Sequence, residues 1–147
     1  ASQIKGHSVN RIYKGIVVGN FKEEYGTINA PIGRNPKDRK KMAIASDGRE
    51  AVTHFTVLEQ FKGYSFVQFK LETGRTHQIR VHMKYMGCPI LGDSIYGKKD
   101  KIFPNATLML HARRLFITLP NGERKEFVAP VPLRFKKVLK HLHDLSC

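Results

Sequence analysis

The run Leu71–His82 (Leu-Glu-Thr-Gly-Arg-Thr-His-Gln-Ile-Arg-Val-His) constrains the fold of this chain most, because it predicts a strand that leads directly into a helix. We expect the helix to span residues 76–86, since Gly87 and Pro89 follow it as stop residues. A helical wheel places Ile79, Met83 and Met86 on one apolar face, and His77, Arg80 and Lys84 on another. The start of this helix therefore carries a cluster of arginine and histidine side chains.

Alternating apolar and polar residues predict a sheet as the main element of the chain. Strands are expected at residues 11–18, 26–32, 51–59, 64–71, 108–118 and 124–128, with hairpin turns at Lys62-Gly63 and Pro120-Asn121-Gly122. Residues 33–50 and 98–107 are expected to form loops, and a last helix to span residues 132–145. Because strands dominate, the predicted class is α+β: a largely antiparallel mixed sheet with few flanking helices. The length fits a single domain, residues 1–147.

The chain is strongly basic, with 26 Lys and Arg against 12 Asp and Glu and a formal net charge of +14. The excess is spread along the whole sequence, which favours a polyanionic partner and above all nucleic acid. Neither an apolar span nor a clearly cationic amphipathic helix is evident, so we expect no membrane partner. No apolar stretch typical of a signal peptide begins the sequence, and Cys88 and Cys147 form no C-x-x-C pattern. A reducing, cytoplasmic location is therefore expected.

The histidines do not predict a metal site. His77 and His82 are five residues apart, which places them about 140° apart around a helix and not in the i, i+4 arrangement of a metal-binding helix. No set of Cys, His and carboxylate residues has the spacing of metal ligands. We therefore expect no metal site from these residues.

Four ordered motifs resemble the RluA-type family of RNA pseudouridine synthases. They are Arg11–Gly19, Pro31–Met42, Leu71–His82 and Gly87–Gly97, and the resemblance extends from about residue 9 to residue 134. That family isomerises uridine in RNA without a metal or cofactor, using an aspartate nucleophile that usually lies in His-Arg-Leu-Asp followed by Thr-Ser-Gly. No such motif occurs in this sequence. The resemblance therefore implies the C-terminal portion of a pseudouridine synthase catalytic domain, without its nucleophile.

The resemblance implies two catalytic residues, Tyr13 and Arg80. In the family, the arginine at the position of Arg80 lies in the active-site cleft and pairs with the catalytic aspartate, whose pKa a guanidinium lowers. With that aspartate missing, we expect Arg80 to have no such partner in this chain. The tyrosine at the position of Tyr13 faces the target base, where its ring can stack on uracil and its hydroxyl can serve in proton transfer. Asp93 matches a structural motif of the family, and Leu115 is a candidate for packing near the base.

The expected loop at residues 33–50 carries a dense group of basic side chains. It resembles a family insertion that reaches around an RNA stem-loop, and cations on a loop bind phosphates by charge without base specificity. Basic residues near the predicted helix extend this surface. The candidate RNA-binding residues are Arg34, Lys37, Arg39, Lys40, Lys41, Arg75, His77 and Lys84.

Two functions remain open at this point. The first is an RNA uridine isomerase that acts on large-subunit ribosomal RNA or another structured RNA such as tRNA, and that is inactive as this chain alone. The second is a non-catalytic basic RNA-binding or ribosome-associated module on the same scaffold. The expected partners are structured RNA and, because a cut sheet exposes an edge, either a second copy or the missing N-terminal part of the domain. The active-site motifs favour the enzyme, since an RNA binder does not require Arg80.

Overall fold

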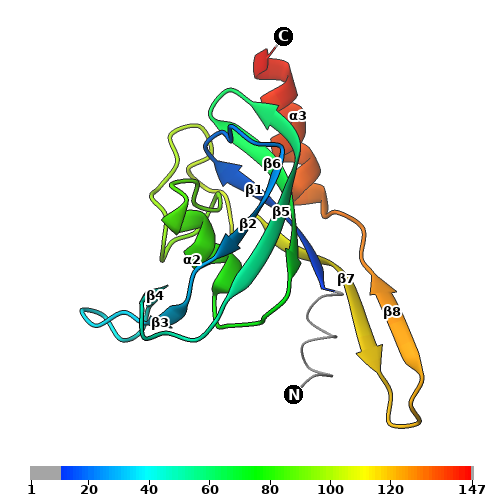
Figure 1. Ribbon diagram of the computed structural model, residues 1–147. Helices are drawn as coiled ribbons and strands as arrows, with labels where there is room; N and C mark the ends of the chain where they lie inside the picture. The colour runs from blue at the N-terminus through cyan, green and yellow to red at the C-terminus, as the bar shows by residue number, and fades with distance from the viewer. Residues whose placement is uncertain (1–10, 147) are drawn as a thin grey trace.

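A six-stranded sheet in the order β2-β5-β6-β1-β7-β8 forms the centre of the molecule, and a smaller sheet pairs β3 with β4. The computed structural model describes residues 11–146, apart from the side chains of residues 114–118, 124, 127 and 146. The strands are β1 (Ile12–Val18), β2 (Tyr25–Asn29), β3 (Ile32–Arg34), β4 (Met42–Ile44), β5 (Val52–Phe61), β6 (Tyr64–Leu71), β7 (Leu110–Thr118) and β8 (Arg124–Val128). The helices are α2 (Gln78–Tyr85) and α3 (Leu133–Ser146). Figure 1 shows the β7–β8 hairpin extending away from the body of the sheet.

The predicted α+β class, with a largely antiparallel sheet and few helices, is confirmed. Each strand pairing within the described part of the chain is antiparallel. The two predicted hairpin turns are present, with Gly63 at φ 81 and Gly122 at φ 88, a region of backbone conformation that glycine adopts without strain. Both helices lie within two residues of their expected ends. None of the helices in residues 11–146 is long and apolar enough to cross a membrane.

The segment 33–50 differs from expectation, because it is not a loop throughout. Its first residues pair with Met42–Ile44 to form the β3–β4 hairpin, in the register Ile32↔Ile44 and Arg34↔Met42. The expected strand 26–32 is divided at Pro31, which has no amide hydrogen to donate to a sheet ladder. Strands of three residues among Gly, Pro and charged residues give no period-two pattern that a sequence could reveal.

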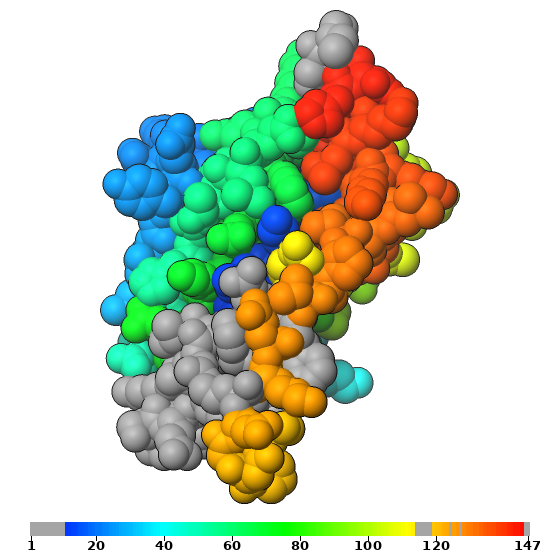
Figure 2. All heavy atoms as spheres, turned by 90° about the vertical axis from the view of Figure 1, so that its right-hand side faces the viewer, coloured from blue at the N-terminus to red at the C-terminus, as the bar shows by residue number. Residues whose placement is uncertain are grey.

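The two helices lie on opposite faces of the large sheet (Figure 1). Tyr13 pairs with Phe69 and Phe69 with Phe55, so these side chains point to one face, the face that α2 covers. On the other face, His143 of α3 forms an ion pair with Glu59 at 3.1 Å. Figure 2 shows α3 packed beside β5 and β6. The core between these layers contains Ile16, Val17, Val67, Phe69, Ile79, Met83, Phe135, Val138 and Leu142.

Candidate active site

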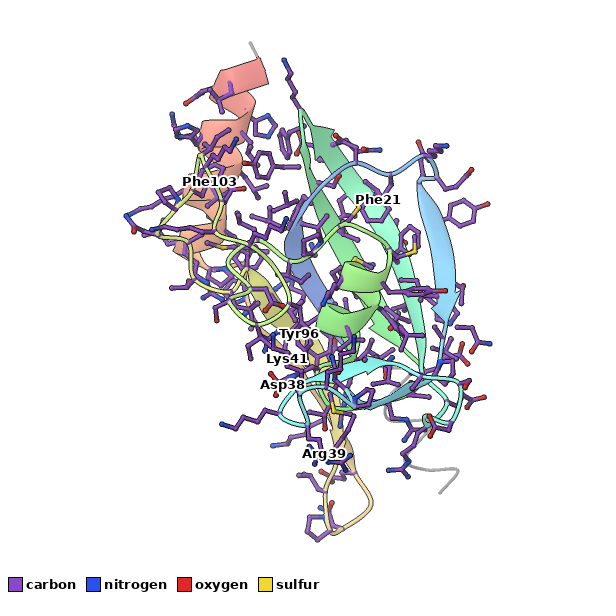
Figure 3. The ribbon with its side chains drawn as sticks, turned by 90° about the vertical axis from the view of Figure 1, so that its left-hand side faces the viewer. Phe21, Asp38, Arg39, Lys41, Tyr96 and Phe103 are labelled. Carbon is purple, nitrogen blue, oxygen red and sulfur yellow. The ribbon has the colours of Figure 1, made fainter. Side chains whose placement is uncertain are left out.

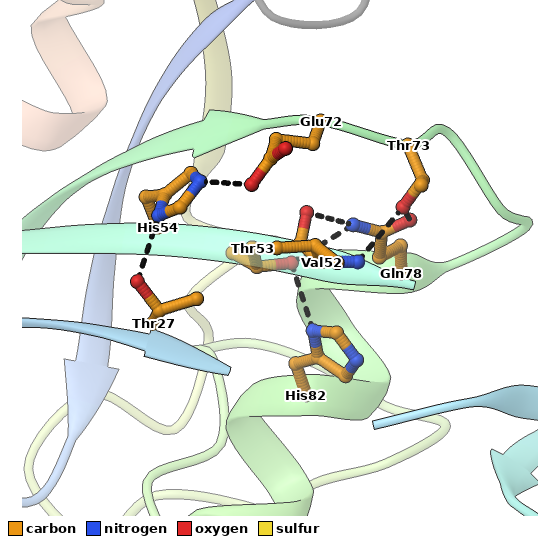
Figure 4. A network of polar contacts seen from close by, with 8 residues as sticks. All are labelled: Thr27, Val52, Thr53, His54, Glu72, Thr73, Gln78 and His82. Carbon is orange, nitrogen blue, oxygen red and sulfur yellow. Dashed lines mark hydrogen bonds and ion pairs between the residues drawn. The ribbon is translucent and has the colours of Figure 1, made fainter. Parts of the chain in front are cut away.

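The side chain of Gln78 hydrogen-bonds both the turn that leads into α2 and the start of β5. Its Nε2 donates to the carbonyl oxygen of Val52 at 3.0 Å and to Thr53 Oγ1 at 2.9 Å. Its Oε1 accepts from the Thr73 hydroxyl at 2.7 Å and from the amide of Arg75 at 3.0 Å. The amide side chain is buried and uses all four of its hydrogen-bonding positions. Figure 4 shows its contacts with Val52, Thr53 and Thr73. The start of α2 is therefore fixed to β5 by a fully satisfied polar network.

His82, one turn later on α2, continues this network. Its Nδ1 lies 2.8 Å from Thr53 Oγ1 (Figure 4). Its Nε2 lies 2.9 Å from the carbonyl oxygen of Ala30. Because a carbonyl oxygen only accepts, Nε2 carries the proton and Nδ1 accepts from the threonine hydroxyl. Burial lowers the pKa of His82, against the opposing effect of the hydrogen bond to Ala30. His82 is therefore a neutral residue that joins α2 to the sheet.

His77 has an unusual backbone conformation at the junction between turn and helix. It precedes α2 with φ 56, and no other non-glycine residue in the described part of the chain has a positive φ. Such a conformation is uncommon away from glycine and concentrates at functional sites. The His77 Nδ1 lies 2.8 Å from the Tyr96 hydroxyl. Burial, followed by the positive charge of Arg80, lowers the pKa of His77.

A cavity of about 230 Å³ lies where this turn meets the sheet. The residues that line it are Tyr13, Leu71, Arg75, His77, Gln78, Ile79, Arg80 and Leu110. It thus contains both residues expected to be catalytic, Tyr13 and Arg80, which are far apart in sequence. Arg75 and His77, expected to bind RNA, line the same cavity, and Arg75 Nε donates to the carbonyl oxygen of Glu50 at 2.6 Å. Neither Asp nor Glu is among the described residues at its wall.

Arg80 has an aspartate partner that the sequence did not indicate: Asp93, which is not in the family's nucleophile motif. Its Nε donates to Asp93 Oδ2 at 2.9 Å and its Nη2 to Asp93 Oδ1 at 2.8 Å, a bidentate ion pair. The Asp93 side chain is fully buried and that of Arg80 is 15% exposed. Asp93 Oδ1 also accepts from the amides of Ile95 and Tyr96, both at 3.0 Å. Asp93 therefore does more than shape its own loop, because it fixes the guanidinium of Arg80.

The electrostatics of this pair favour its charged form. Burial acts to raise the pKa of Asp93, but the hydrogen bonds from Arg80, Tyr96 and Ile95 outweigh it and hold the pKa below its usual value. The hydrogen bond to Asp93 raises the pKa of Arg80. The Tyr96 ring adds a cation–π contact, with the guanidinium carbon 5.3 Å from the ring centroid. Nη1 of Arg80 has no hydrogen-bond acceptor within the described residues, so this edge is open to another group.

The basic residues of the β3–β4 hairpin lie apart from this cavity. Arg34, Lys37, Arg39 and Lys40 are exposed and Lys41 is half-buried on the turn between the two strands. Figure 3 labels Arg39 and Lys41 on this hairpin. The amide of Met42 donates to the Tyr96 hydroxyl at 2.9 Å, which ties the hairpin to the active-site loop. Lys84 lies on α2 and lines a separate hollow of about 200 Å³ at the base of the hairpin.

Comparison with known proteins assigns the family. Residues 1–85 match the family described as RNA pseudouridylate synthase. The chain belongs to this family. It is 44% identical over 143 residues to an uncharacterized RNA pseudouridine synthase of Chloroflexus aurantiacus, a match that covers 97% of this chain and 45% of that protein. It is 41% identical over 144 residues to the ribosomal large subunit pseudouridine synthase D of Borreliella burgdorferi, covering 97% of this chain and 44% of that protein.

Solved structures agree with this pseudouridylate synthase assignment. The human RNA pseudouridylate synthase domain containing 1 protein superimposes with a TM-score of 0.74 at 29% identity, covering 95% of this chain and 67% of that one. The human domain containing 4 protein gives a TM-score of 0.75 at 26% identity, covering 97% and 65%. The chain spans slightly less than half the length of the curated pseudouridine synthases that it matches.

Three residues beside this cavity were missed or undervalued from the sequence. Gln78 and Tyr96 were given no role, and Asp93 was given only a local one. The spacing of Asp93 to Tyr96 could have indicated an aspartate that accepts from amides two and three residues later, but not that Arg80 lies opposite. The side chain of Leu115, a candidate for packing near the base, lies outside the described residues.

Proposed function

We propose that this chain supplies the tyrosine and arginine side of an active site that isomerises uridine to pseudouridine in structured RNA. One observation carries the proposal: Tyr13 and Arg80 line the same cavity, beside Arg75 and His77. Family membership and similarity to proteins named large-subunit synthases favour ribosomal RNA as the substrate, and hence a cytoplasmic location. Residues 1–147 would form the C-terminal portion of a single catalytic domain.

In this proposal, residues of this chain bind the base and assist the reaction, and the nucleophile comes from outside the described cavity wall. An aspartate attacks the nucleoside at base or sugar, and the bond between N1 and C1′ breaks. The uracil rotates and forms a bond from C5 to C1′, and the bond to the aspartate breaks and releases the carboxylate. C5 then loses its proton and N1 gains one. The ring of Tyr13 holds the extruded base, and its hydroxyl is placed for proton transfer. The open Nη1 edge of Arg80 keeps the attacking carboxylate ionised, because a nearby guanidinium lowers the pKa of a carboxyl.

The RNA itself would be held by charge on the β3–β4 hairpin. Its five basic residues are Arg34, Lys37, Arg39, Lys40 and Lys41, and Arg75, His77 and Lys84 extend the surface along α2. Arg34 Nη1 donates to the carbonyl oxygen of Arg39 at 2.9 Å, which stiffens the turn. Such contacts bind phosphates without reading bases, so affinity is expected to depend strongly on salt.

A chimera gives the decisive test. Residues 1–147 replace the matching segment of YlyB, the Bacillus subtilis relative that is 46% identical over 142 residues. The chimera should form pseudouridine in an unmodified ribosomal RNA transcript, as measured by nucleoside analysis, whereas the 147-residue chain alone should form none. Pseudouridine formed by the chain alone would show that it holds its own nucleophile.

Two substitutions in this chimera separate catalysis from binding. Arg80→Lys keeps the charge but loses the planar fork, so turnover should fall at least about 100-fold while RNA affinity stays within about twofold. Tyr13→Phe keeps the stacking ring and tests the hydroxyl alone. Equal losses of RNA affinity and turnover in Arg80→Lys would mean that Arg80 is a phosphate contact.

A non-catalytic RNA-binding module is the second candidate. It is favoured by the absence of a carboxylate from the described cavity wall and by the engagement of Arg80 with Asp93. A chimera that binds RNA as tightly as YlyB but forms no pseudouridine would support this second function.

A further inference from the structure

A second and larger cavity, of about 480 Å³, lies on the other side of Tyr96. It is bounded by the end of β1, the start of β6, the segment at Pro89 and the loop that follows Tyr96. Its walls are mainly apolar, from Val18, Tyr64, Pro89, Ile90, Tyr96, Gly97 and Ile102. Its size falls within the roughly 300–1,000 Å³ typical of sites for small molecules.

Three lysines border this cavity, against a single carboxylate, Asp100. Lys98, Lys99 and Lys101 are exposed and have no ion pair within residues 11–146. The neighbouring carboxylate, Asp100, is already engaged, because its Oδ2 accepts from the Tyr64 hydroxyl at 2.7 Å and from two backbone amides of its own loop. An isolated positive patch thus lies directly at the mouth of an apolar hollow.

The cavity wall also includes an exposed isoleucine, which distinguishes it from an ordinary charged surface that faces water. Ile102 is 45% exposed at the cavity wall, between Lys101 and the half-buried Phe103. Burial, together with the hydrogen bond to Asp100, raises the pKa of Tyr64, so its hydroxyl stays protonated and occupied by Asp100. The groups left to contact a ligand are therefore apolar carbon and three ammonium groups, beside the remaining carboxylate oxygen of Asp100. Sites for single-stranded nucleic acid combine these two features, a flat apolar surface for a base and cations for the backbone.

We propose that this cavity binds a nucleotide of the RNA, with the base against the apolar wall and the adjacent phosphates on Lys98, Lys99 and Lys101. The inference rests on the proposed function, because it adds a second RNA contact to the same surface. Tyr96 connects the two sites: its ring lines this cavity, while its hydroxyl bonds His77, which lines the cavity of Tyr13 and Arg80. An RNA strand held at one site therefore passes close to the other, and the formal net charge of +14 favours RNA over a cationic or neutral partner.

The test compares three variants of the 147-residue chain, each of which replaces three lysines by glutamine. The loop variant changes Lys98, Lys99 and Lys101, the hairpin variant changes Lys37, Lys40 and Lys41, and the control changes Lys62, Lys136 and Lys137. The residues of the control are exposed and lie away from both cavities. Binding of a labelled single-stranded oligouridylate is followed by fluorescence anisotropy between about 50 and 200 mM salt, the range over which phosphate contacts weaken most visibly.

The loop variant should flatten the plot of log affinity against log salt by about 2, since each lost single-strand phosphate contact contributes about 0.7. The affinity ratio of parent to loop variant should then shrink about 20-fold across that salt range. A loop variant that behaves like the control overturns the second site. If the hairpin variant still shows a flatter salt dependence of RNA affinity than the control, the proposed function is not contradicted. If neither variant differs from the control, the proposed RNA-binding function fails as well.

Isoleucine methyl NMR tests whether a base enters the cavity. Oligouridylate should shift the methyl signals of Ile90 and Ile102 but not that of Ile28, which lies in the main core and does not line this cavity. If the Ile90 and Ile102 signals do not change at saturating RNA, no base enters the cavity and the nucleotide site is refuted. The lysines would then only contact phosphates at the surface. Equal binding of poly-glutamate, with the same methyl shifts, would refute the assignment to RNA in favour of an acidic protein segment.

Discussion

The ion pair between Arg80 and Asp93 makes a quantitative prediction for the substitution Asp93→Asn. The asparagine keeps the shape of the side chain and one oxygen that can accept from the amides of Ile95 and Tyr96. Its other terminal atom, at the place of Oδ2, becomes an NH2 donor that faces the donor Nε of Arg80, which now lies 2.9 Å from that carboxylate oxygen. The oxygen at the place of Oδ1 can still accept from Nη2, as it now does at 2.8 Å. The substitution therefore removes the charge-assisted hydrogen bond of Nε, leaves Nη2 with a neutral acceptor and deprives the guanidinium of its negatively charged partner.

The cost follows from the burial of the two side chains. Removing one member of a buried pair destabilises a protein by about 3–5 kcal/mol. Arg80 is 15% exposed while Asp93 is fully buried, so the guanidinium can partly reach water and the lower end of this range applies. A loss of about 3 kcal/mol corresponds to a fall in Tm of roughly 6–12 °C for a chain of this size.

The matched control is Asp144→Asn on α3. Asp144 pairs with Lys140 at 3.1 Å, but these side chains are 66% and 79% exposed, so its loss should change the free energy of unfolding by less than about 0.5 kcal/mol. Thermal and urea melts of the parent and both variants at neutral pH provide the comparison. If Asp93→Asn melts within 2 °C of Asp144→Asn, by the same scaling of about 2–4 °C per kcal/mol, the pair does not stabilise the fold.

The pH dependence gives a second check on the same pair. The pKa of Asp93 in the folded state lies below its usual value of 3.8, so the folded state binds this proton less readily than the unfolded state. The stability that Asp93 contributes is therefore fully present above pH 3.8 and is lost as the pH falls through the lower, folded-state pKa. The difference in free energy of unfolding between parent and Asp93→Asn should be constant near neutral pH and shrink in acid.

Three further predictions concern the scaffold around the site. Gly48→Ala should lower the free energy of unfolding by about 1–3 kcal/mol, because a Cβ there would lie 2.5 Å from the carbonyl carbon of Ile32 and displace the β3–β4 hairpin. The displaced hairpin should also bind RNA more weakly. Urea melts measure the first effect and fluorescence anisotropy the second. Thr53→Val leaves Gln78 Nε2 and His82 Nδ1 without their hydroxyl partner, so it should lower the free energy of unfolding by about 1–3 kcal/mol for each of them. The exposed Thr56→Val on the same strand should change it little in the same melts. Burial lowers the pKa of His82 below 6.5, so the folded state binds this proton less readily than the unfolded state. The free energy of unfolding should therefore decline as the pH falls below 6.5, and this decline should be smaller in His82→Gln.

The sheet and the two helices could be predicted because their signals are local and periodic. Strands alternate in and out with period two, and the segment 64–71 shows this in its buried residues. The hairpin turns carry glycine where a positive φ is needed, and α2 ends before Gly87, at φ 80. Each of these features depends on residues within a few positions of one another, which is the range over which sequence patterns are informative.

The partner of Arg80 could not be predicted, because it depends on how a loop returns to the sheet. Asp93 reaches the helix because the segment before it pairs with the end of β1, beyond the residues that pair with β7. There the amide of Leu91 donates to the carbonyl oxygen of Ile16 at 2.8 Å. The amide of Val18 likewise donates to the carbonyl oxygen of Pro89 at 2.8 Å. These contacts join residues about 70 positions apart and leave no periodic trace. The grouping of Tyr13 with Arg80, by contrast, followed from family resemblance and agrees with the cavity that they share.

Arg80 is held in place by residues of the chain itself, and this bears on why the position is an arginine. Two of its nitrogens are committed to Asp93, its plane lies over Tyr96, and only Nη1 lacks an acceptor among the described residues. A guanidinium can bind one carboxylate along one edge and present its remaining N–H groups elsewhere, because its five donors are fixed in a plane. A lysine ammonium at this position would have to choose between Asp93 and an incoming carboxylate. The geometry therefore assigns Asp93 the task of orienting Arg80, so that the cost of ordering this long side chain is met during folding and not during substrate binding.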